Sequence, residues 1–158
     1  MAVTPEVLLI PVKAREYDAF FAMLADYTRD LSQYDTEAAE DGGDWDPELH
    51  RHSVLDDMEG RELLWIEADG ERAGLAMVRV YPDFPDESRN VADIAEFTVL
   101  PAFRGRGIGS AAVETLLADH RARGTYLVDA SVLRDNPALA FWQRLGFIVR
   151  SVNTSRRP

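Results

Sequence analysis

The sequence predicts an α/β protein built on a mixed β-sheet with helices on both faces. Short apolar runs of β-type residues alternate with segments whose apolar residues recur every three or four positions. In the first half, two neighbouring apolar runs are joined by a short Gly-containing turn, which indicates antiparallel strands. The second half alternates strand, helix, strand, helix, strand with short connections, which indicates parallel crossovers.

The first elements follow from hydrophobic spacing. Residues 7–12 form a β-type run, and from Glu16 the apolar positions between residues 17 and 31 recur at three and four, which predicts an amphipathic helix of about four turns. Residues 35–48 hold seven acids and a Gly pair, which is typical of a loop. Pro47 is suited to start a second short helix, reaching Met58.

The remaining elements are punctuated by Gly and Pro. Residues 63–68 and 73–81 form a predicted hairpin around the turn 69–72, and a loop follows at 82–89. The later predicted elements are a strand over 91–100, a helix over 107–123, a strand over 126–133, a helix over 137–145 and a last strand over 147–152.

Length and composition limit the possible classes. A chain of 158 residues is expected to form a single domain over residues 1–158, and 46% apolar residues suffice for a core. The chain has no cysteine, which excludes disulfides, thiolate zinc sites and a cysteine nucleophile. The apolar run from Val7 to Ile10 ends at Pro11 without a basic segment before it, so we expect no signal peptide, no membrane association and a cytoplasmic location.

The charge is distributed unevenly. The net charge of −11 argues against nucleic-acid binding, which depends on clustered Lys and Arg. Residues 1–98 carry 8 basic and 24 acidic side chains, a net charge of −16, whereas residues 99–158 carry 9 basic and 4 acidic ones, a net charge of +5. An anionic ligand is therefore expected in the second half and a cationic one in the first.

A Gly-rich turn stands between the strand at 91–100 and the following helix. Three alternating glycines, Gly105, Gly107 and Gly109, allow backbone N–H groups to converge at a helix N-terminus, where the helix dipole attracts anions. The segment Arg104, Gly105, Arg106, Gly107, Ile108, Gly109 and Ser110 is therefore expected to hold a pyrophosphate, with both arginines adding charged contacts.

Two other nucleotide-binding motifs, the Walker loop and the dinucleotide fingerprint, also contain a Gly-rich turn before a helix. A Walker loop needs a lysine, and no lysine follows Lys13, so we exclude it. The pattern Gly107-x-Gly109-x-x-Ala112, with Asp129 about 20 residues on, fits a dinucleotide fingerprint. An NAD(P)-binding oxidoreductase therefore stays open as an alternative on the motif alone.

Two longer segments resemble the GNAT superfamily of acetyl-coenzyme A-dependent N-acyltransferases. EFTVLPAFRGRGIGSAAVETLL carries that family's pyrophosphate motif as Arg104, Gly107 and Gly109. DNPALAFWQRLGF carries its second motif as Asn136, Trp142, Leu145, Gly146 and Phe147. The resemblance covers residues 91–150 by motif and 7–81 only by order of elements. It implies a GNAT-type fold and acetyl-coenzyme A as cosubstrate.

The resemblance also implies how the acyl donor binds. The strand before the Gly-rich turn separates from the next parallel strand, and the pantetheine arm hydrogen-bonds to the exposed main chain of Phe97, Thr98 and Val99. The N–H of Val99 or Leu100 would polarise the thioester carbonyl. Asn136 would contact the cofactor, and Trp142, which replaces the tyrosine acid of many relatives, would pack against its arm.

A base is needed to deprotonate the attacking amine. Glu96, in an otherwise apolar strand, is the first candidate, and Asp93 is the second. Many relatives have their base one position before Glu96, where this chain has Ala95, so strand alternation turns Glu96 to the other face unless a β-bulge restores it. His50 and His52 do not share a helix face, and we expect no metal site.

These observations predict an N-acetyltransferase that transfers acetyl directly to a primary amine, such as a cationic small molecule or a basic peptide terminus. The acceptor is expected to enter beside residues 26–59, where acids are dense. A non-catalytic acyl-coenzyme A sensor is the further alternative. Because the chain ends six residues after Val152, residues 147–152 are expected to be an unpaired edge that favours a homodimer.

Overall fold

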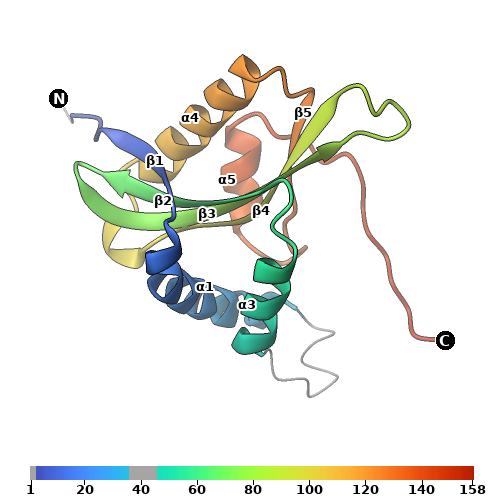
Figure 1. The fold of residues 1–158 in the computed structure, drawn as a ribbon, viewed down its shortest axis with the longest axis horizontal. Coiled ribbons are helices and arrows are strands. Elements are labelled where there is room, and N and C mark those ends of the chain that lie inside the picture. The colour runs from blue at the N-terminus through green and yellow to red at the C-terminus, as the bar shows by residue number, and fades with distance from the viewer. Residues whose placement is uncertain (1–2, 36–45) are drawn as a thin grey trace.

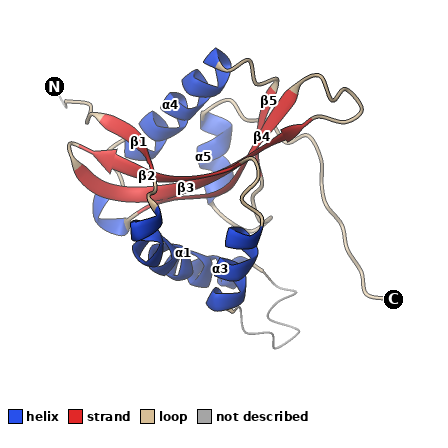
Figure 2. Ribbon diagram, in the orientation of Figure 1, coloured by secondary structure: helices blue, strands red, loops and turns tan. Residues whose placement is uncertain are grey.

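The computed structural model describes residues 3–35 and 46–158, which form a five-stranded sheet with helices on both faces (Figures 1 and 2). The strands are β1 (Val7–Pro11), β2 (Arg61–Ala68), β3 (Glu71–Pro82), β4 (Asn90–Val99) and β5 (Leu127–Ala130). The helices are α1 (Tyr17–Leu31), α3 (Pro47–Asp56), α4 (Ile108–Ala122) and α5 (Ala138–Arg144), with short 3₁₀ turns at Ala14–Glu16, Ser32–Tyr34 and Pro101–Phe103.

The strands lie in the order β1-β2-β3-β4-β5. The pairs from β1 to β4 are antiparallel, and β4 and β5 are parallel. The predicted mixed sheet, antiparallel first and parallel in the second half, is therefore confirmed. The parallel pair is connected through α4, as expected for a β-α-β crossover.

The sheet is buried on both faces because its central strands are apolar throughout. Leu63 and Trp65 of β2 pack with α1 and α3, whereas their neighbours Leu64 and Ile66 face the other core, toward α4 and α5. This alternation follows from the two-residue period of a strand. Figure 1 shows the resulting three layers, with α1 and α3 below the sheet and α4 and α5 above it.

Local signals fix the start of α3. The side chain of Asp46 accepts hydrogen bonds from the backbone N–H groups of Glu48 and Leu49, at 3.0 and 3.2 Å, and Pro47 occupies the first turn. The prediction of a helix from Pro47 is confirmed, although it ends at Asp56 rather than Met58. Residues 36–45 of the predicted acidic loop lie outside the described residues.

The prediction of a last strand over 147–152 is wrong. These residues form no strand, and residues 148–158 are exposed. The apolar β-branched residues report a propensity, but a strand also needs a neighbour for its backbone hydrogen bonds, and none lies beside this segment. The predicted strand over 126–133 is also shorter, Leu127–Ala130, so β5 forms the edge of the sheet on this side.

Candidate active site

The strand β4 separates from β5 halfway along its length. Pairing of the two strands runs from Val91–Leu127 to Ile94–Ala130, whereas β4 continues to Val99. Residues 95–99 therefore have no neighbouring strand on the β5 side among the described residues. The opening implied by the family resemblance is present, and an extended ligand can add its own hydrogen bonds there.

Alternation of the ladder determines which backbone groups face this opening. The N–H of Leu100 donates to the carbonyl of Ala73 on β3 at 2.7 Å. It is therefore not available to polarise a thioester carbonyl, so the prediction of Leu100 for this role is wrong. In an antiparallel ladder the next residue points the other way, so the N–H of Val99 faces the opening. The carbonyl of Val99 accepts a hydrogen bond from Arg104 Nε at 2.8 Å. This bond fixes the Arg104 side chain beside the end of β4.

The Gly-rich turn places free N–H donors at the start of α4. Gly105 and Gly107 have φ values of +75° and +76°, a conformation that favours glycine. The first helical hydrogen bond runs from the N–H of Ala111 to the carbonyl of Gly107, at 3.0 Å. The N–H groups of Ile108, Gly109 and Ser110 therefore lack helical acceptors and, with the helix dipole, can bind an anion.

The other residues of the turn have different surroundings. Ile108 is 1% exposed and anchors the turn in the core, whereas Arg106 is exposed, with its guanidinium 5.6 Å from the Phe103 ring. A Cβ on Gly109 would lie 3.3 Å from the ring of Phe141 on α5. Gly109 thus allows α4 and α5 to approach, and a substitution there perturbs packing as well as ligand binding.

The second motif starts and buries α5. The side-chain oxygen of Asn136 accepts a hydrogen bond from the N–H of Ala138 at 2.9 Å, so part of its role is to cap this helix. Trp142 is 7% exposed and lies 5.4 Å from Phe97, 5.1 Å from Phe141 and 5.1 Å from Phe147, ring centre to ring centre. The Trp142 indole therefore packs beside β4. Thr98 of β4 is also buried.

A β-bulge places Glu96 on the face of α1 and α3. Met77 of β3 pairs with Glu96, but Val78 pairs with Ile94, so Ala95 is an extra residue in β4. Ala95 packs with the α1–α3 core, and the bulge lets Glu96 lie opposite Met77 of the same core. The bulge therefore resets the alternation, and Glu96 shares its face with Asp93.

The surroundings of Glu96 and Asp93 raise the pKa of both carboxylates, which makes them better proton acceptors. Burial, together with the nearby charge of Asp93, raises the pKa of Glu96 to about 7. Burial and the charge of Asp129 raise the pKa of Asp93, although Arg61 opposes this shift. Asp93 lies between Arg79 of β3 and Asp129 of β5 in one row across the sheet. Of the two candidates, Glu96 has a pKa suited to a base near neutral pH.

Tyr27 of α1 is a residue that the sequence patterns do not identify. Burial together with the charge of Glu96 raises the pKa of Tyr27 to about 12, while the nearby N–H of Phe97 opposes this shift. The Tyr27 hydroxyl therefore lies beside the candidate base and at the opening in β4. No motif marks this position, because Tyr27 is one of several apolar residues at helical spacing.

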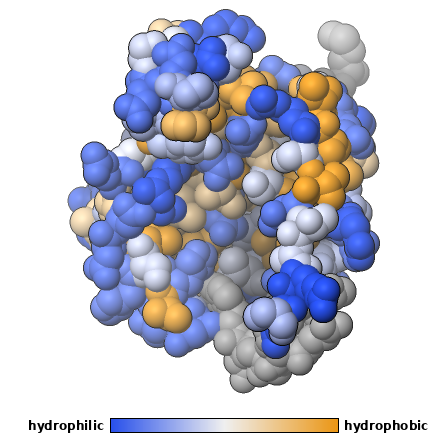
Figure 3. All heavy atoms as spheres, turned by 90° about the vertical axis from the view of Figure 1, so that its right-hand side faces the viewer, coloured by the Kyte–Doolittle hydropathy of each residue, from blue (hydrophilic) through white to orange (hydrophobic). Residues whose placement is uncertain are grey.

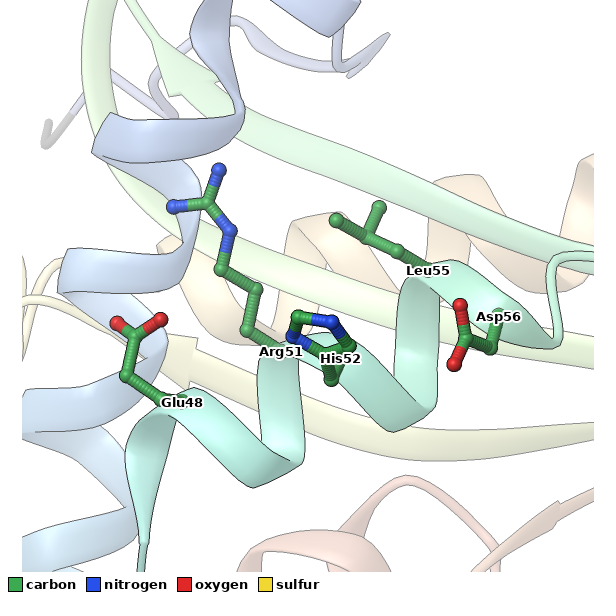
Figure 4. A pocket seen from close by; sticks show the side chains of 5 residues that line it. All are labelled: Glu48, Arg51, His52, Leu55 and Asp56. Carbon is green, nitrogen blue, oxygen red and sulfur yellow. The ribbon is translucent and has the colours of Figure 1, made fainter.

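The expected acceptor side holds a pocket of about 430 Å³ on α3, lined by Glu48, Arg51, His52, Leu55 and Asp56 (Figure 4). These five residues share one face of the helix. The Arg51 guanidinium also contacts Asp18 of α1 at 2.8 Å. The pocket is thus polar and of mixed charge.

Two kinds of feature are absent from residues 3–35 and 46–158. The described residues contain no group of three or more His, Asp or Glu side chains that could hold a metal ion. None of the described helices has the length and hydrophobicity needed to cross a membrane.

The geometry can be compared with known proteins. The model of the acetyltransferase (GNAT) family matches residues 21–147. The chain belongs to the GNAT family of acetyltransferases. The dinucleotide-binding alternative is wrong for this GNAT protein, because β4 has an antiparallel neighbour in β3, whereas a dinucleotide-binding sheet is parallel around its first strand.

Two curated relatives align with part of this GNAT protein. An uncharacterized N-acetyltransferase of Methanocaldococcus jannaschii is 42% identical over 67 residues, 42% of this chain. A glucosamine 6-phosphate N-acetyltransferase of Trypanosoma brucei brucei is 32% identical over 80 residues, 49% of this chain. The alignments cover 30% and 52% of the relatives' own lengths.

Solved structures confirm the GNAT fold over nearly the whole chain. A ribosomal-protein-alanine N-acetyltransferase from Brucella melitensis biovar Abortus 2308 has a TM-score of 0.73 at 17% identity, covering 96% of this chain and 99% of that one. An aminoglycoside acetyltransferase from an uncultured soil metagenomic sample has a TM-score of 0.65 at 21% identity, covering 97% and 99%. At these identities the likeness concerns the fold alone.

Proposed function

We propose that this GNAT protein is an acetyl-coenzyme A-dependent N-acetyltransferase that acetylates a primary amine by direct transfer. One observation carries the proposal: a half-buried carboxylate, Glu96, lies at the strand opening with its pKa raised to about 7. Strongly shifted carboxylates in such openings are typical of proton-transfer sites. The family and the named relatives support the reaction class.

The described residues fit the acyl donor. The free N–H groups of residues 108–110, together with Arg104 and Arg106, suit a pyrophosphate. The main chain at Phe97 and Val99 faces the opening and suits the pantetheine arm, with Asn136 and Trp142 on the facing segment, whereas the same alternation turns the backbone of Thr98 toward β3. Acetyl-coenzyme A supplies an activated thioester.

The proposed step needs a base but no covalent enzyme intermediate. Glu96 takes a proton from the acceptor ammonium, and the free amine nitrogen attacks the thioester carbon. The N–H of Val99 stabilises the oxyanion that develops. The tetrahedral intermediate collapses by breaking the carbon–sulfur bond, which releases an amide and a thiolate. Glu96 already holds the first proton, so the second proton, from the attacking nitrogen, passes through water to the thiolate, and Glu96 then releases its own proton to solvent.

We propose a cationic acceptor. Asp93, Asp129 and Glu96 share the sheet face toward α1 and α3, and residues 46–59 contain Asp46, Glu48, Asp56, Asp57 and Glu59. An acidic surface raises the local concentration of cations. Three of the similar proteins are named for their acceptors, an amino sugar phosphate, a protein alanine and an aminoglycoside, which all contain primary amines. A basic small molecule or a basic peptide terminus carries a primary amine and would also be attracted to the acidic surface.

Salt dependence tests the charge of the acceptor. Raising ionic strength screens the attraction between an ammonium group and the acidic face, so the KM for the acceptor is expected to increase more than the KM for acetyl-coenzyme A. Steady-state kinetics at several salt concentrations measure both constants. An acceptor KM that does not change with salt, or a preferred acceptor that is anionic, contradicts this assignment.

Replacement of Trp142 tests whether the protein needs an acid at this position. Because an indole does not ionise usefully, Trp142→Phe is expected to keep turnover within about tenfold while weakening coenzyme A binding. Trp65→Phe, in the opposite core, is the matched control: it also shrinks a buried ring but should leave coenzyme A affinity unchanged. A drop in kcat beyond about a hundredfold with unchanged affinity would assign Trp142 to the chemical step.

A further inference from the structure

Thr98 of β4 is a buried polar residue whose hydroxyl has no hydrogen bond to any described residue. The described part of the chain buries two polar residues, Thr98 at 8% and His120 at 2% exposure. His120 is satisfied, because its ring nitrogens contact the Thr125 hydroxyl and the Arg123 guanidinium, each at 2.9 Å. Thr98 has no such partner. A buried hydroxyl without a partner costs free energy, so it points to a ligand that supplies one.

The Thr98 oxygen borders space that solvent can reach. Among the described residues, Trp65 Nε1 is the one side-chain nitrogen or oxygen that is both enclosed and without a partner. The Thr98 oxygen also lacks a partner but is not such an atom, so it is not enclosed. Thr98 lies in the part of β4 that continues beyond the pairing with β5. Its hydroxyl is therefore an accessible polar group in the wall of the strand opening.

Thr98 and Glu96 share one face of β4. Thr98 pairs with Leu75 of β3. Glu96 pairs with Met77, and both of these β3 residues belong to the core against α1 and α3. Two positions in a strand span about 7 Å, so one small polar group can contact both side chains. The alternation that turns the backbone of Thr98 toward β3 thus leaves its side chain on the face where the acceptor is proposed to enter.

A second hydroxyl approaches this place from α1. Tyr27 is half-buried against the same core, and its hydroxyl lies near the backbone N–H of Phe97, between Glu96 and Thr98 in the chain. On the side of the molecule that Figure 3 shows, hydrophilic residues cover much of the surface, where water satisfies them. These three oxygen-bearing side chains lie instead against an apolar core. Polar groups placed there need a polar ligand.

Three oxygen atoms suit a primary ammonium group. Such a group has three N–H donors, and the Glu96 carboxylate and the hydroxyls of Thr98 and Tyr27 offer an acceptor for each. After Glu96 has taken one proton, the two hydroxyls still hold the nitrogen through its remaining N–H groups. A secondary amine would place a carbon against one of these oxygens and leave that oxygen unpaired, which a site built from hydrogen bonds disfavours.

We propose that the Thr98 hydroxyl binds the acceptor nitrogen together with Glu96 and Tyr27, and that these three side chains select primary amines. The inference rests on the proposed function, because it takes Glu96 as the base. It adds two residues that contact the acceptor and gives a structural reason for the preference for a primary amine.

Thr98→Val removes the hydroxyl and keeps the shape of the side chain. We expect kcat/KM for a primary amine to fall by about 10- to 100-fold, with the KM for acetyl-coenzyme A unchanged. Thr98→Ser keeps the hydroxyl and should stay within about threefold of the wild type. Thr115→Val, on α4, is the matched control, because it removes a hydroxyl that already bonds to the carbonyl of Ala111. Wild-type kinetics in Thr98→Val, or an equal loss in Thr98→Ser, overturns the inference.

The choice between primary and secondary amines is measured with 1,4-diaminobutane and its N,N′-dimethyl derivative. The wild type should prefer the primary diamine by about tenfold or more in kcat/KM. The preference should shrink several-fold in Thr98→Val, because the methyl group no longer displaces a hydrogen bond there. A preference of the same size in both proteins contradicts the assignment of Thr98.

Binding measured without turnover separates this inference from the proposed function. In protein labelled with ¹³C at the threonine methyl groups and saturated with coenzyme A, 1,4-diaminobutane should shift the Thr98 signal, which is identified by its absence in Thr98→Val. The dimethyl derivative should shift this signal less. A shift without acetylation supports the site and overturns the proposed function. Acetylation without a shift at Thr98 overturns this inference alone, and neither shift nor acetylation overturns both.

Discussion

Glu96→Gln is expected to lower kcat/KM for the amine by roughly 10²- to 10⁴-fold while leaving acetyl-coenzyme A affinity unchanged. The introduced amide keeps the size of the side chain but cannot take a proton from the acceptor. The wild-type kcat/KM should rise with pH through an apparent pKa of about 7, because Glu96 works as a base only when it is ionised. In the variant this rise should disappear, leaving only the pH dependence of the amine itself.

The same substitution is expected to stabilise the folded protein at alkaline pH. Burial and Asp93 raise the pKa of Glu96 in the folded state from an ordinary 4.5 to about 7, so the wild-type chain loses stability as pH rises between these values. The amide of the variant cannot ionise and escapes this loss. At pH 8.5 the variant should be more stable by up to about 3 kcal/mol, and the difference should vanish at about pH 4.

Thermal and urea unfolding at both pH values, with pH–rate profiles, measure these effects. Glu114→Gln, at an exposed position of α4, is the matched control and should alter neither rate nor stability by much. If Glu96→Gln keeps near-wild-type turnover, Glu96 is not the base. Asp93→Asn, on the same face of β4, is then the variant to test.

Gly107→Ala is expected to weaken coenzyme A binding by about tenfold or more. Gly107 precedes the free N–H groups of α4 and has a φ of +76°, so a Cβ there strains the turn and displaces the donors. Nothing lies within 4 Å of that Cβ position, so the substitution causes no clash in the free protein. Gly109→Val also weakens binding, but it disturbs Phe141 as well.

Gly124→Ala provides a close control for this test. Gly124 has a φ of +74° and nothing within 4 Å of its Cβ position, but it follows the other end of α4. Both variants should lose similar stability, whereas only Gly107→Ala should lose affinity in calorimetric titration with coenzyme A. If the two folded variants bind coenzyme A with equal affinity, the Gly-rich turn is not part of the site for the acyl donor.

The sequence predicts most of this site because its signals are local. The Gly-rich turn, the start of α3 at Pro47 and the order of strands all depend on residues that are neighbours in the chain. The face of Glu96 depends on the bulge at Ala95, which is a property of the pairing with β3 and has no residue signature. The β-type run 147–152 is misleading for a related reason, because propensity does not supply a neighbouring strand.

Contacts between distant segments are the least predictable part. Tyr27 and Phe97 lie 70 positions apart in the chain, with α3, β2 and β3 between them, yet the Tyr27 hydroxyl lies close to the N–H of Phe97. Its spacing in α1 predicts a core residue, and its ring does pack there. Only the position of α1 against the bulged part of β4 shows that its hydroxyl reaches the opening.

Thiol release in the presence of acetyl-coenzyme A and a library of amines tests the central claim most directly. Because the chain has no cysteine, every thiol detected by a colorimetric reagent comes from the coenzyme. We predict release that requires a primary amine, favours cationic acceptors, yields an N-acetylated product by mass spectrometry and is lost in Glu96→Gln. Tight acetyl-coenzyme A binding without amine-dependent thiol release over the whole library would contradict the account and favour a non-catalytic acyl-coenzyme A sensor.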